Sequence, residues 1–159
     1  MNNTYNNLNE NQKKAVQVDV NAVIAAGAGS GKTKVLASRY VHLITEKNYQ
    51  VEDILALTFT EKAATEMYQR IYDELQKYAK ADDITQEKRE TGNSVQQKRA
   101  SAALNSFFKA QIMTIDAFCH KIAVTSCRRF GISPDFTIDL LESKRLAYNL
   151  SLDFFLEHR

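Results

Sequence analysis

The stretch that decides the fold is Asn21-Ala-Val-Ile-Ala-Ala-Gly-Ala-Gly-Ser-Gly-Lys-Thr33, continued by Lys34-Val-Leu-Ala-Ser-Arg-Tyr40. Residues 22–26 are a short apolar run of the kind that forms a buried parallel strand. Glycines between positions 27 and 31 interrupt that run, and from Lys32 onward apolar side chains recur at helical spacing. A strand, a glycine-rich loop and a helix in this order are the context that a phosphate-binding loop requires.

The chemistry of such a loop follows from its backbone. Glycines let successive N–H groups approach phosphate oxygens closely, and the helix start adds unpaired N–H groups and a positive dipole end. Lys32 would supply a charge to the β- and γ-phosphates and Thr33 a hydroxyl to Mg²⁺. The sequence therefore predicts an ATP–Mg²⁺ site with Lys32 and Thr33 as catalytic groups and Thr33 as the metal ligand. Its nucleotide-binding residues would include Ala26, Gly27, Ala28, Gly29, Ser30, Gly31, Lys32, Thr33 and Lys34. Ala26 replaces the first glycine of the usual pattern, and a glycine-rich turn that binds nothing is the alternative.

Composition narrows the class of protein. A length of 159 residues suits one domain, and 44% hydrophobic with 25% charged residues is ordinary for a soluble globular chain. A net charge of +2 means that any nucleic-acid surface would be a local basic patch. Cys119 and Cys127 fit neither a zinc pair nor a disulfide framework, so we expect buried thiols in a cytoplasmic protein. No apolar run approaches membrane-spanning length, and no membrane contact is expected.

Two interpretations compete for Gln12, in a short helix expected from Asn9 to about Val18. In the first, Asn9 is the helix N-cap and Gln12 completes a capping box by reaching back to the N–H of residue 9. In the second, the Gln12 amide donates to and accepts from an adenine edge together. The local sequence leaves both open.

A second apolar run, residues 54–59, is followed by a helix that begins at Thr60. Repetition of strand and helix favours a parallel α/β fold, in which ligands bind beyond the carboxyl ends of the strands. Thr58, Phe59 and Thr60 would lie there. Two hydroxyls and an aromatic ring suit a single nucleic-acid strand. The alternative is a strand end with Thr60 as an N-cap and Phe59 in the core.

The rest of the chain continues the pattern after an interruption. Residues 79–100 lack aromatic side chains and carry mixed charges, which indicates a solvated insertion. A helix should resume near Val95, a third strand should span 111–115, and a helix should follow over 116–130 with Gly131 ending it. A last helical stretch is expected over 141–159.

Four segments together resemble the N-terminal end of superfamily 1 DNA helicases of the UvrD/Rep type, and most closely the AddA/RecB-like helicase–nuclease branch. Leu8-Asn-Glu-Asn-Gln-Lys-Lys-Ala-Val16 resembles the Q motif, and Ala25-Ala-Gly-Ala-Gly-Ser-Gly-Lys-Thr33 resembles motif I. Leu57-Thr-Phe-Thr-Glu-Lys-Ala-Ala-Thr-Glu-Met67 resembles motif Ia, and Met113-Thr-Ile-Asp-Ala-Phe-Cys119 resembles motif Ic. Their order and spacing fit that family.

The resemblance implies a three-layer RecA-like P-loop NTPase fold with a parallel sheet. Residues 1–135 would be part of motor domain 1A, with a mobile insertion near 79–95, and residues 136–159 would start the helical subdomain 1B. It also implies ATP-dependent DNA unwinding or translocation in repair or recombination, alongside a second helicase–nuclease subunit. Gln12 would then contact adenine, and single-stranded DNA would meet Thr58, Phe59, Thr60, Lys62 and Thr114. Glu61 and Asp116 depart from the family, which usually carries Asn and His there.

The family's Walker B acidic pair and second motor domain are not in these residues, so the resemblance implies that this chain alone hydrolyses ATP poorly. Two other functions stay open. In one, the apolar run before Asp116 is a Walker B strand, Asp116 orients Mg²⁺, and the chain is a complete small P-loop kinase or ATPase. In the other, the chain is a non-enzymatic module that binds nucleotide or DNA.

Overall fold

The computed structural model describes residues 8–27, 29–80, 93–131, 133, 135, 136 and 139–157. The chain divides into two compact units, Met1–Phe118 and Cys119–Arg159. Most of the insertion predicted near 79–95 lies outside the described residues, as does Ala28 of the glycine-rich loop. The predicted division at residue 135 into parts of domains 1A and 1B stays a prediction.

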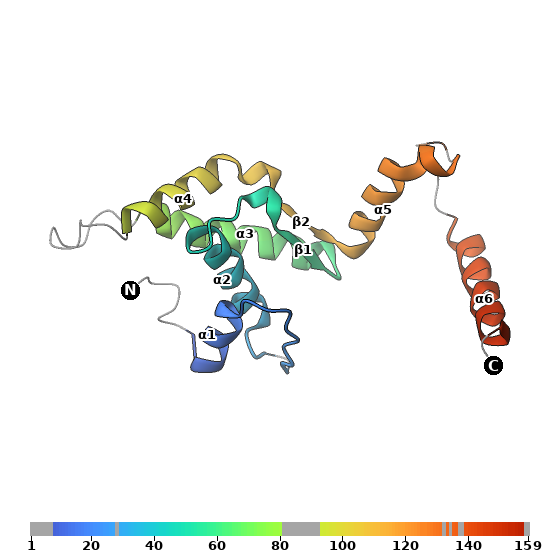
Figure 1. Cartoon of the computed structure of the whole chain (residues 1–159), viewed down its shortest axis with the longest axis horizontal. Coiled ribbons are helices and arrows are strands. Elements are labelled where there is room, and N and C mark those ends of the chain that lie inside the picture. Colours follow the sequence, from blue (N-terminus) through green and yellow to red (C-terminus); the bar gives the residue numbers. More distant parts are fainter. Residues whose placement is uncertain are drawn as a thin grey trace. The chain divides into compact units, whose positions relative to one another are not determined.

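The first unit combines helices with a small sheet (Figure 1). Its helices are α1 (Glu10–Gln17), α2 (Lys32–Thr45), α3 (Glu61–Ala79) and α4 (Asn93–Asn105). Two single turns of 3₁₀-helix, η1 (Val51–Asp53) and η3 (Phe107–Lys109), lead into the strands β1 (Leu55–Thr58) and β2 (Gln111–Thr114). The four α-helices and the two strands were expected from the sequence, within a few residues at the ends, whereas the two 3₁₀ turns were not.

The start of α3 is determined by a capping residue next to it in the sequence. Thr60 has extended backbone geometry, and its hydroxyl accepts a hydrogen bond from the N–H of Ala63 at 3.2 Å, so it caps α3. Along α3 the buried side chains fall at helical spacing and form one face: Met67, Ile71, Leu75 and Tyr78. That face packs against α2 and α4.

The two strands are parallel, with Leu55 opposite Gln111 and Thr58 opposite Thr114. Ala56 and Ile112 pack against the helical core, whereas Leu55 and Leu57 point to the other face and are 44% and 39% exposed. The core therefore covers one face of the sheet. The predicted α/β class and the parallel pairing are confirmed.

The strand predicted over residues 22–26 is wrong for this structure. These residues have no regular secondary structure, Val23 is fully exposed, and Ile24 is about half exposed. An apolar run indicates burial, but a strand also needs a neighbour for its N–H and C=O groups. Among the described residues β1 and β2 pair only with each other, so no strand edge holds this run.

An aromatic cluster fixes η3 against α3. Phe107 is 1% exposed, and its ring centroid lies 4.6 Å from that of Tyr68 and 5.5 Å from that of Tyr72, both in tilted arrangements. Such pairs add stability beyond their buried area. Because η3 leads directly into β2, the cluster positions the second strand.

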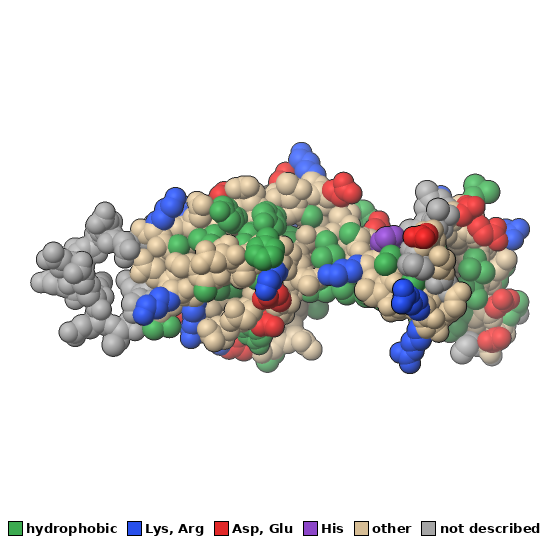
Figure 2. All heavy atoms as spheres, turned by 90° about the horizontal axis from the view of Figure 1, so that it is seen from above, with side chains coloured by type: hydrophobic (Ala, Val, Ile, Leu, Met, Phe, Trp, Pro, Cys, Tyr) green, Lys and Arg blue, Asp and Glu red, His purple; other side chains and the backbone are tan. Residues whose placement is uncertain are grey.

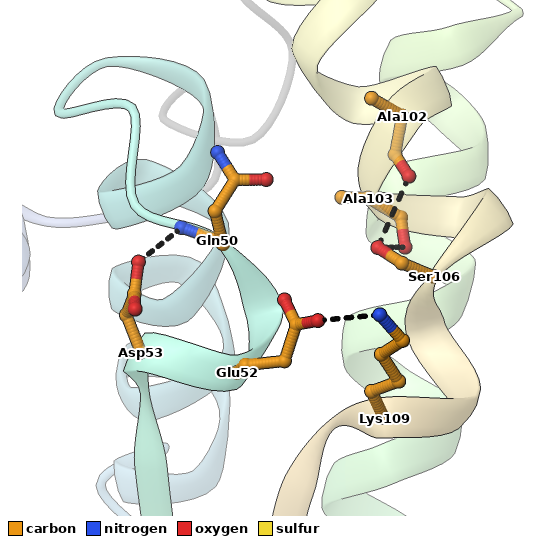
Figure 3. Close-up of polar contacts among 7 residues, drawn as sticks. All are labelled: Gln50, Glu52, Asp53, Ala102, Ala103, Ser106 and Lys109. Carbon is orange, nitrogen blue, oxygen red and sulfur yellow. Dashed lines mark hydrogen bonds and ion pairs between the residues drawn. The ribbon is translucent and has the colours of Figure 1, made fainter.

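An ion pair joins the segments that precede the two strands (Figure 3). Glu52 of η1 and Lys109 of η3 meet at 2.8 Å. The hydrogen bond from Lys109 lowers the pKa of the Glu52 carboxyl. In the same turn the N–H of Gln50 donates to the Asp53 carboxylate at 2.9 Å. The Glu52–Lys109 pair therefore joins the segments before the amino ends of β1 and β2, and the Gln50–Asp53 bond closes the η1 turn.

The second unit contains most of α5 (Ile115–Ser126), η4 (Cys127–Phe130) and α6 (Leu140–Glu157). Gly131 ends η4 in the left-handed region, with φ at 69°, as its position in the sequence predicts. Both cysteines are free thiols; Cys127 is buried as expected, but Cys119 is exposed, which corrects that expectation. Among the described residues, no helix combines the length and the apolar composition that crossing a membrane requires.

Candidate functional site

The glycine-rich loop turns sharply into α2. Gly29 and Gly31 have φ values of 74° and 81°, a region that side-chain-bearing residues rarely adopt. Gly31 is the N-cap of α2, and its carbonyl accepts the first helical hydrogen bond, from Val35 at 3.0 Å. The Ser30 hydroxyl donates to the carbonyl of Gly27 at 2.8 Å. The backbone therefore has the conformation that presents a helix N-terminus to an anion.

The Lys32 side chain is hydrogen-bonded to the loop that precedes it. Its ammonium donates to the carbonyl of Ala26 at 3.0 Å and to that of Gly27 at 2.7 Å. Such charged hydrogen bonds are stronger than neutral ones. A bound triphosphate would offer the same ammonium better acceptors, because phosphate oxygens are negatively charged and backbone carbonyls are neutral.

Gln12 of α1 reaches the loop as well as its own helix cap. Its side-chain oxygen accepts from the N–H of Asn9 at 2.9 Å, and the Asn9 side chain accepts from the N–H of Gln12 at 2.9 Å. This reciprocal pair is the capping box that the sequence predicts. The amide nitrogen of Gln12 also donates to the carbonyl of Ser30 at 3.1 Å, a contact that the sequence did not predict.

Several contacts dock α1 on α2. Arg39 donates to the carbonyls of Val16 and Val18 at 3.0 and 2.6 Å, at the end of α1. Asp19 pairs with Lys47 at 2.8 Å, and the hydrogen bond from Lys47 lowers the pKa of the Asp19 carboxyl. A small apolar cluster of Leu8, Val16 and Val35 lies between the two helices.

A cavity of about 400 Å³ lies between α1 and the loop. Its volume is within the ordinary range for small-molecule sites. Five predicted nucleotide-binding residues line it: Gln12, Ala26, Gly27, Ser30 and Lys32. The rest of its lining consists of Asn9, Asn11, Ala15, Ile24, Ala25, Val35 and Leu36, which the sequence reasoning did not assign. Ala15 lies three positions after Gln12 and four after Asn11, a helical spacing that places it beside both on α1 and could have identified it.

The other predicted nucleotide residues that the structure describes do not line this cavity. Gly29 and Gly31 shape the turn, and Thr33 and Lys34 lie half-buried in the first turn of α2. Among the described residues no group of three or more His, Cys, Asp or Glu side chains is placed to hold a metal ion. A Mg²⁺ ion here would therefore depend on Thr33 together with phosphate oxygens of a bound nucleotide.

The predicted nucleic-acid residues gather at the carboxyl ends of the two strands. Register places Thr58 opposite Thr114. The Thr58 hydroxyl donates to the carbonyl of Thr60 at 3.0 Å, and the Thr114 hydroxyl accepts from the N–H of Ala117 at 3.1 Å. Two segments far apart in the sequence thus meet at one edge, from which α3 and α5 begin.

The Phe59 side chain at this edge is 90% exposed, which is unusual for a phenylalanine. The alternative that placed Phe59 in the core is wrong, whereas the alternative that made Thr60 an N-cap is confirmed. Glu61 and Lys62 follow on the first turn of α3, and both are exposed. The edge therefore offers an aromatic ring and one cation beside a carboxylate.

Asp116 does not end a strand. β2 stops at Thr114, and Asp116 is exposed in the first turn of α5. The interpretation of residues 112–116 as a Walker B strand is therefore not matched by the structure. On the face of the first unit that Figure 2 shows, basic and acidic side chains are scattered, and the described residues form no continuous basic area there.

The chain matches known proteins over most of its length. Residues 8–153 match the model of the UvrD/REP helicase N-terminal domain. An ATP-dependent helicase/nuclease subunit of Clostridium kluyveri is 36% identical over 152 residues, which cover 93% of this chain and 11% of that protein. Its counterpart from Lactococcus lactis is 33% identical over 118 residues, covering 74% and 9%.

A probable DNA helicase from Mycoplasma pneumoniae is 54% identical over 66 residues, which cover 40% of this chain and 12% of that protein. The chain thus spans between 9% and 12% of the length of these relatives. Its resemblance to UvrD/Rep-type helicases and to the AddA-like branch is confirmed. The chain belongs to the UvrD/REP helicase N-terminal domain family and is homologous to the N-terminal part of ATP-dependent helicase/nucleases.

Proposed function

We propose that this chain supplies the ATP-phosphate-binding and single-strand-contacting part of an ATP-dependent DNA helicase that acts in recombination or repair. The conformation of the glycine loop carries the proposal: two glycines at positive φ deliver the chain into the N-terminus of α2, beside a cavity of about 400 Å³. Loop N–H groups and Lys32 would bind the triphosphate, and Thr33 would bind Mg²⁺. The cavity between α1 and the loop would hold the base near Gln12.

The second half of the proposal concerns DNA. Phe59 would stack on a base, and Thr58, Thr60, Lys62 and Thr114 would contact the sugar–phosphate backbone. This chain alone should bind single-stranded DNA weakly, because Glu61 and Asp116 place carboxylates at the same edge and the net charge is only +2.

The relatives' names support two further parts of the proposal: ATP as the energy source and a second subunit as a partner. A relative that is named as one subunit of a helicase/nuclease implies at least one other subunit in the same assembly. We propose such an assembly for the whole protein of which these residues form a part. The parallel sheet of a three-layer RecA-like fold would then be completed by residues outside the described strands. Two free thiols, Cys119 and Cys127, fit the reducing cytoplasm, which is the compartment we propose.

Lys32→Ala tests the nucleotide half. Lys32 would contribute at least one charged hydrogen bond, worth roughly 1.5–3 kcal/mol, so the affinity for a fluorescent ATP analogue with Mg²⁺ should fall about tenfold or more. Lys14→Ala on α1 is the matched control, because it removes the same charge from an exposed position outside the cavity. Equal affinity in Lys32→Ala and the parent would refute the proposal.

A steady-state ATPase assay on the parent chain tests the expectation that these residues alone turn over ATP at background rates. Turnover at about 1 per second or faster, within the ordinary enzyme range, would contradict it. If Asp116→Asn also abolished that turnover, the small complete ATPase would become the better function.

A further inference from the structure

Gln12 is joined to the glycine loop by a hydrogen bond that needs no nucleotide. Its amide nitrogen lies 3.1 Å from the carbonyl oxygen of Ser30. The amide also lies beside the next loop residue, Gly31, because a Cβ added there would lie only 3.3 Å from the same nitrogen. The amide therefore packs on the turn that precedes α2, although 18 positions separate Gln12 from Ser30 in the sequence.

The orientation of this amide is set by α1. The N–H of Asn9 donates to the Gln12 side-chain oxygen at 2.9 Å, so the amide NH₂ group must face the other way, toward Ser30. Arg39 and the Asp19–Lys47 pair hold α1 against α2 at its other end. The capping box thus fixes the direction of a side chain whose other end rests on the loop.

We propose that Gln12 is a positioning residue for the phosphate loop: its amide fixes the Ser30–Gly31 turn, so that Gln12 determines the affinity for phosphates even when no base is present. The proposal rests on the function proposed above and deepens it. A residue that only contacts the base would affect nucleotides and leave a bare polyphosphate chain unaffected. A residue that orders the loop affects both.

Inorganic tripolyphosphate with Mg²⁺ is therefore the decisive probe, measured by calorimetry beside Mg²⁺–ATP. We expect Gln12→Ala to weaken tripolyphosphate and ATP alike, by about three- to tenfold, the range of one net hydrogen bond. Gln17→Ala is the matched control on the same helix, and it should leave both affinities unchanged because Gln17 is exposed and does not line the cavity. Loss of ATP affinity alone, or no loss at all, would overturn the proposal.

A merely structural role of Gln12 in α1 is tested separately. Glu10→Ala removes a first-turn carboxylate and its 2.8 Å ion pair with Lys13, which weakens the helix start without touching the Gln12 amide. It should lower the melting temperature and leave tripolyphosphate affinity unchanged. The positioning role would be wrong if both variants, Glu10→Ala and Gln12→Ala, lost tripolyphosphate affinity in proportion to the decrease in their melting temperatures.

Gln12→Glu provides a readout without any ligand. The glutamate keeps an acceptor for the Asn9 N–H, and so keeps the capping box, but has no N–H to donate to Ser30. Amide hydrogen exchange at Ser30 and Gly31 should be faster in this variant than in the parent, with α1 protection retained; unchanged exchange would refute the positioning role.

The failure of the proposed function and the failure of this inference give different results. If the Lys32→Ala protein and the parent bound tripolyphosphate equally, the proposed function would fail, and this inference with it. Normal parent binding with an unaffected Gln12→Ala would overturn the inference alone.

Discussion

Replacing Phe59 by alanine should separate DNA binding from folding. The ring is 90% exposed, so its removal takes almost no apolar surface out of the core, and the free energy of unfolding should change by less than about 0.5 kcal/mol. The same exposure leaves both faces of the ring available to a base. Stacking of one base on an aromatic ring is worth about 1–3 kcal/mol, which predicts a loss of about 5- to 150-fold in affinity for single-stranded DNA.

The assay is fluorescence anisotropy of a labelled oligothymidylate, titrated with the parent and with each variant over a series of salt concentrations. Phe59 carries no charge, so Phe59→Ala should lower the affinity at every salt concentration and leave the slope of log affinity against log salt unchanged. A change of slope would show that the substitution had altered phosphate contacts instead.

The control is another exposed phenylalanine of the same unit. Phe108 is 78% exposed in η3, which precedes the amino end of β2, whereas Phe59 follows the carboxyl end of β1. Phe108→Ala should leave the affinity unchanged. An equal loss in both variants would mean nonspecific apolar binding, and no loss in Phe59→Ala would refute the assignment of this edge to DNA.

Three further predictions concern charge, packing and pH. Lys62→Gln should lower single-strand affinity and reduce the magnitude of the salt slope by about 0.7, the value of one phosphate contact, in the same anisotropy assay; an unchanged slope would contradict contact with phosphate. Phe107→Ala should destabilise the chain by about 3–5 kcal/mol in urea unfolding, because it empties the buried site beside Tyr68 and Tyr72; a loss below about 1 kcal/mol would contradict this packing. Burial holds the pKa of His42 below its ordinary value of 6.5, so the unfolded chain binds that proton more readily. Stability should be complete above pH 6.5 and fall as the pH drops toward the lowered pKa, and His42→Gln should flatten that decline.

Local chemistry made much of this fold predictable. Asn9 with Gln12, Thr60 and Gly131 are residues whose side chains or backbone freedom act within a few positions, so the ends of their helices could be located from the sequence. The strands ending at Thr58 and Thr114 could be located for the same reason, because a short apolar run between polar segments is itself a local pattern.

The features that could not be predicted from the sequence depend on contacts between residues far apart along the chain. Residues 22–26 carry the composition of a strand, but strand formation depends on which edge lies beside them, and composition does not encode that neighbour. The bond from Gln12 to Ser30 spans 18 positions, and nothing in either local sequence indicates it. For Phe59 the local sequence left two interpretations open, a ring that contacts a nucleic-acid strand and a ring in the core, because its 90% exposure depends on packing with residues far away in the sequence.

The two-stranded sheet has a practical consequence for handling the chain in solution. Among the described residues each strand pairs on one side only, and the sheet face that carries Leu55 and Leu57 is open to water. Unpaired edges flanked by apolar side chains template pairing between molecules. We expect self-association to rise with protein concentration, and it would mimic cooperative DNA binding in a titration. Light scattering recorded on the same samples would identify the dilution at which an isotherm reports monomers.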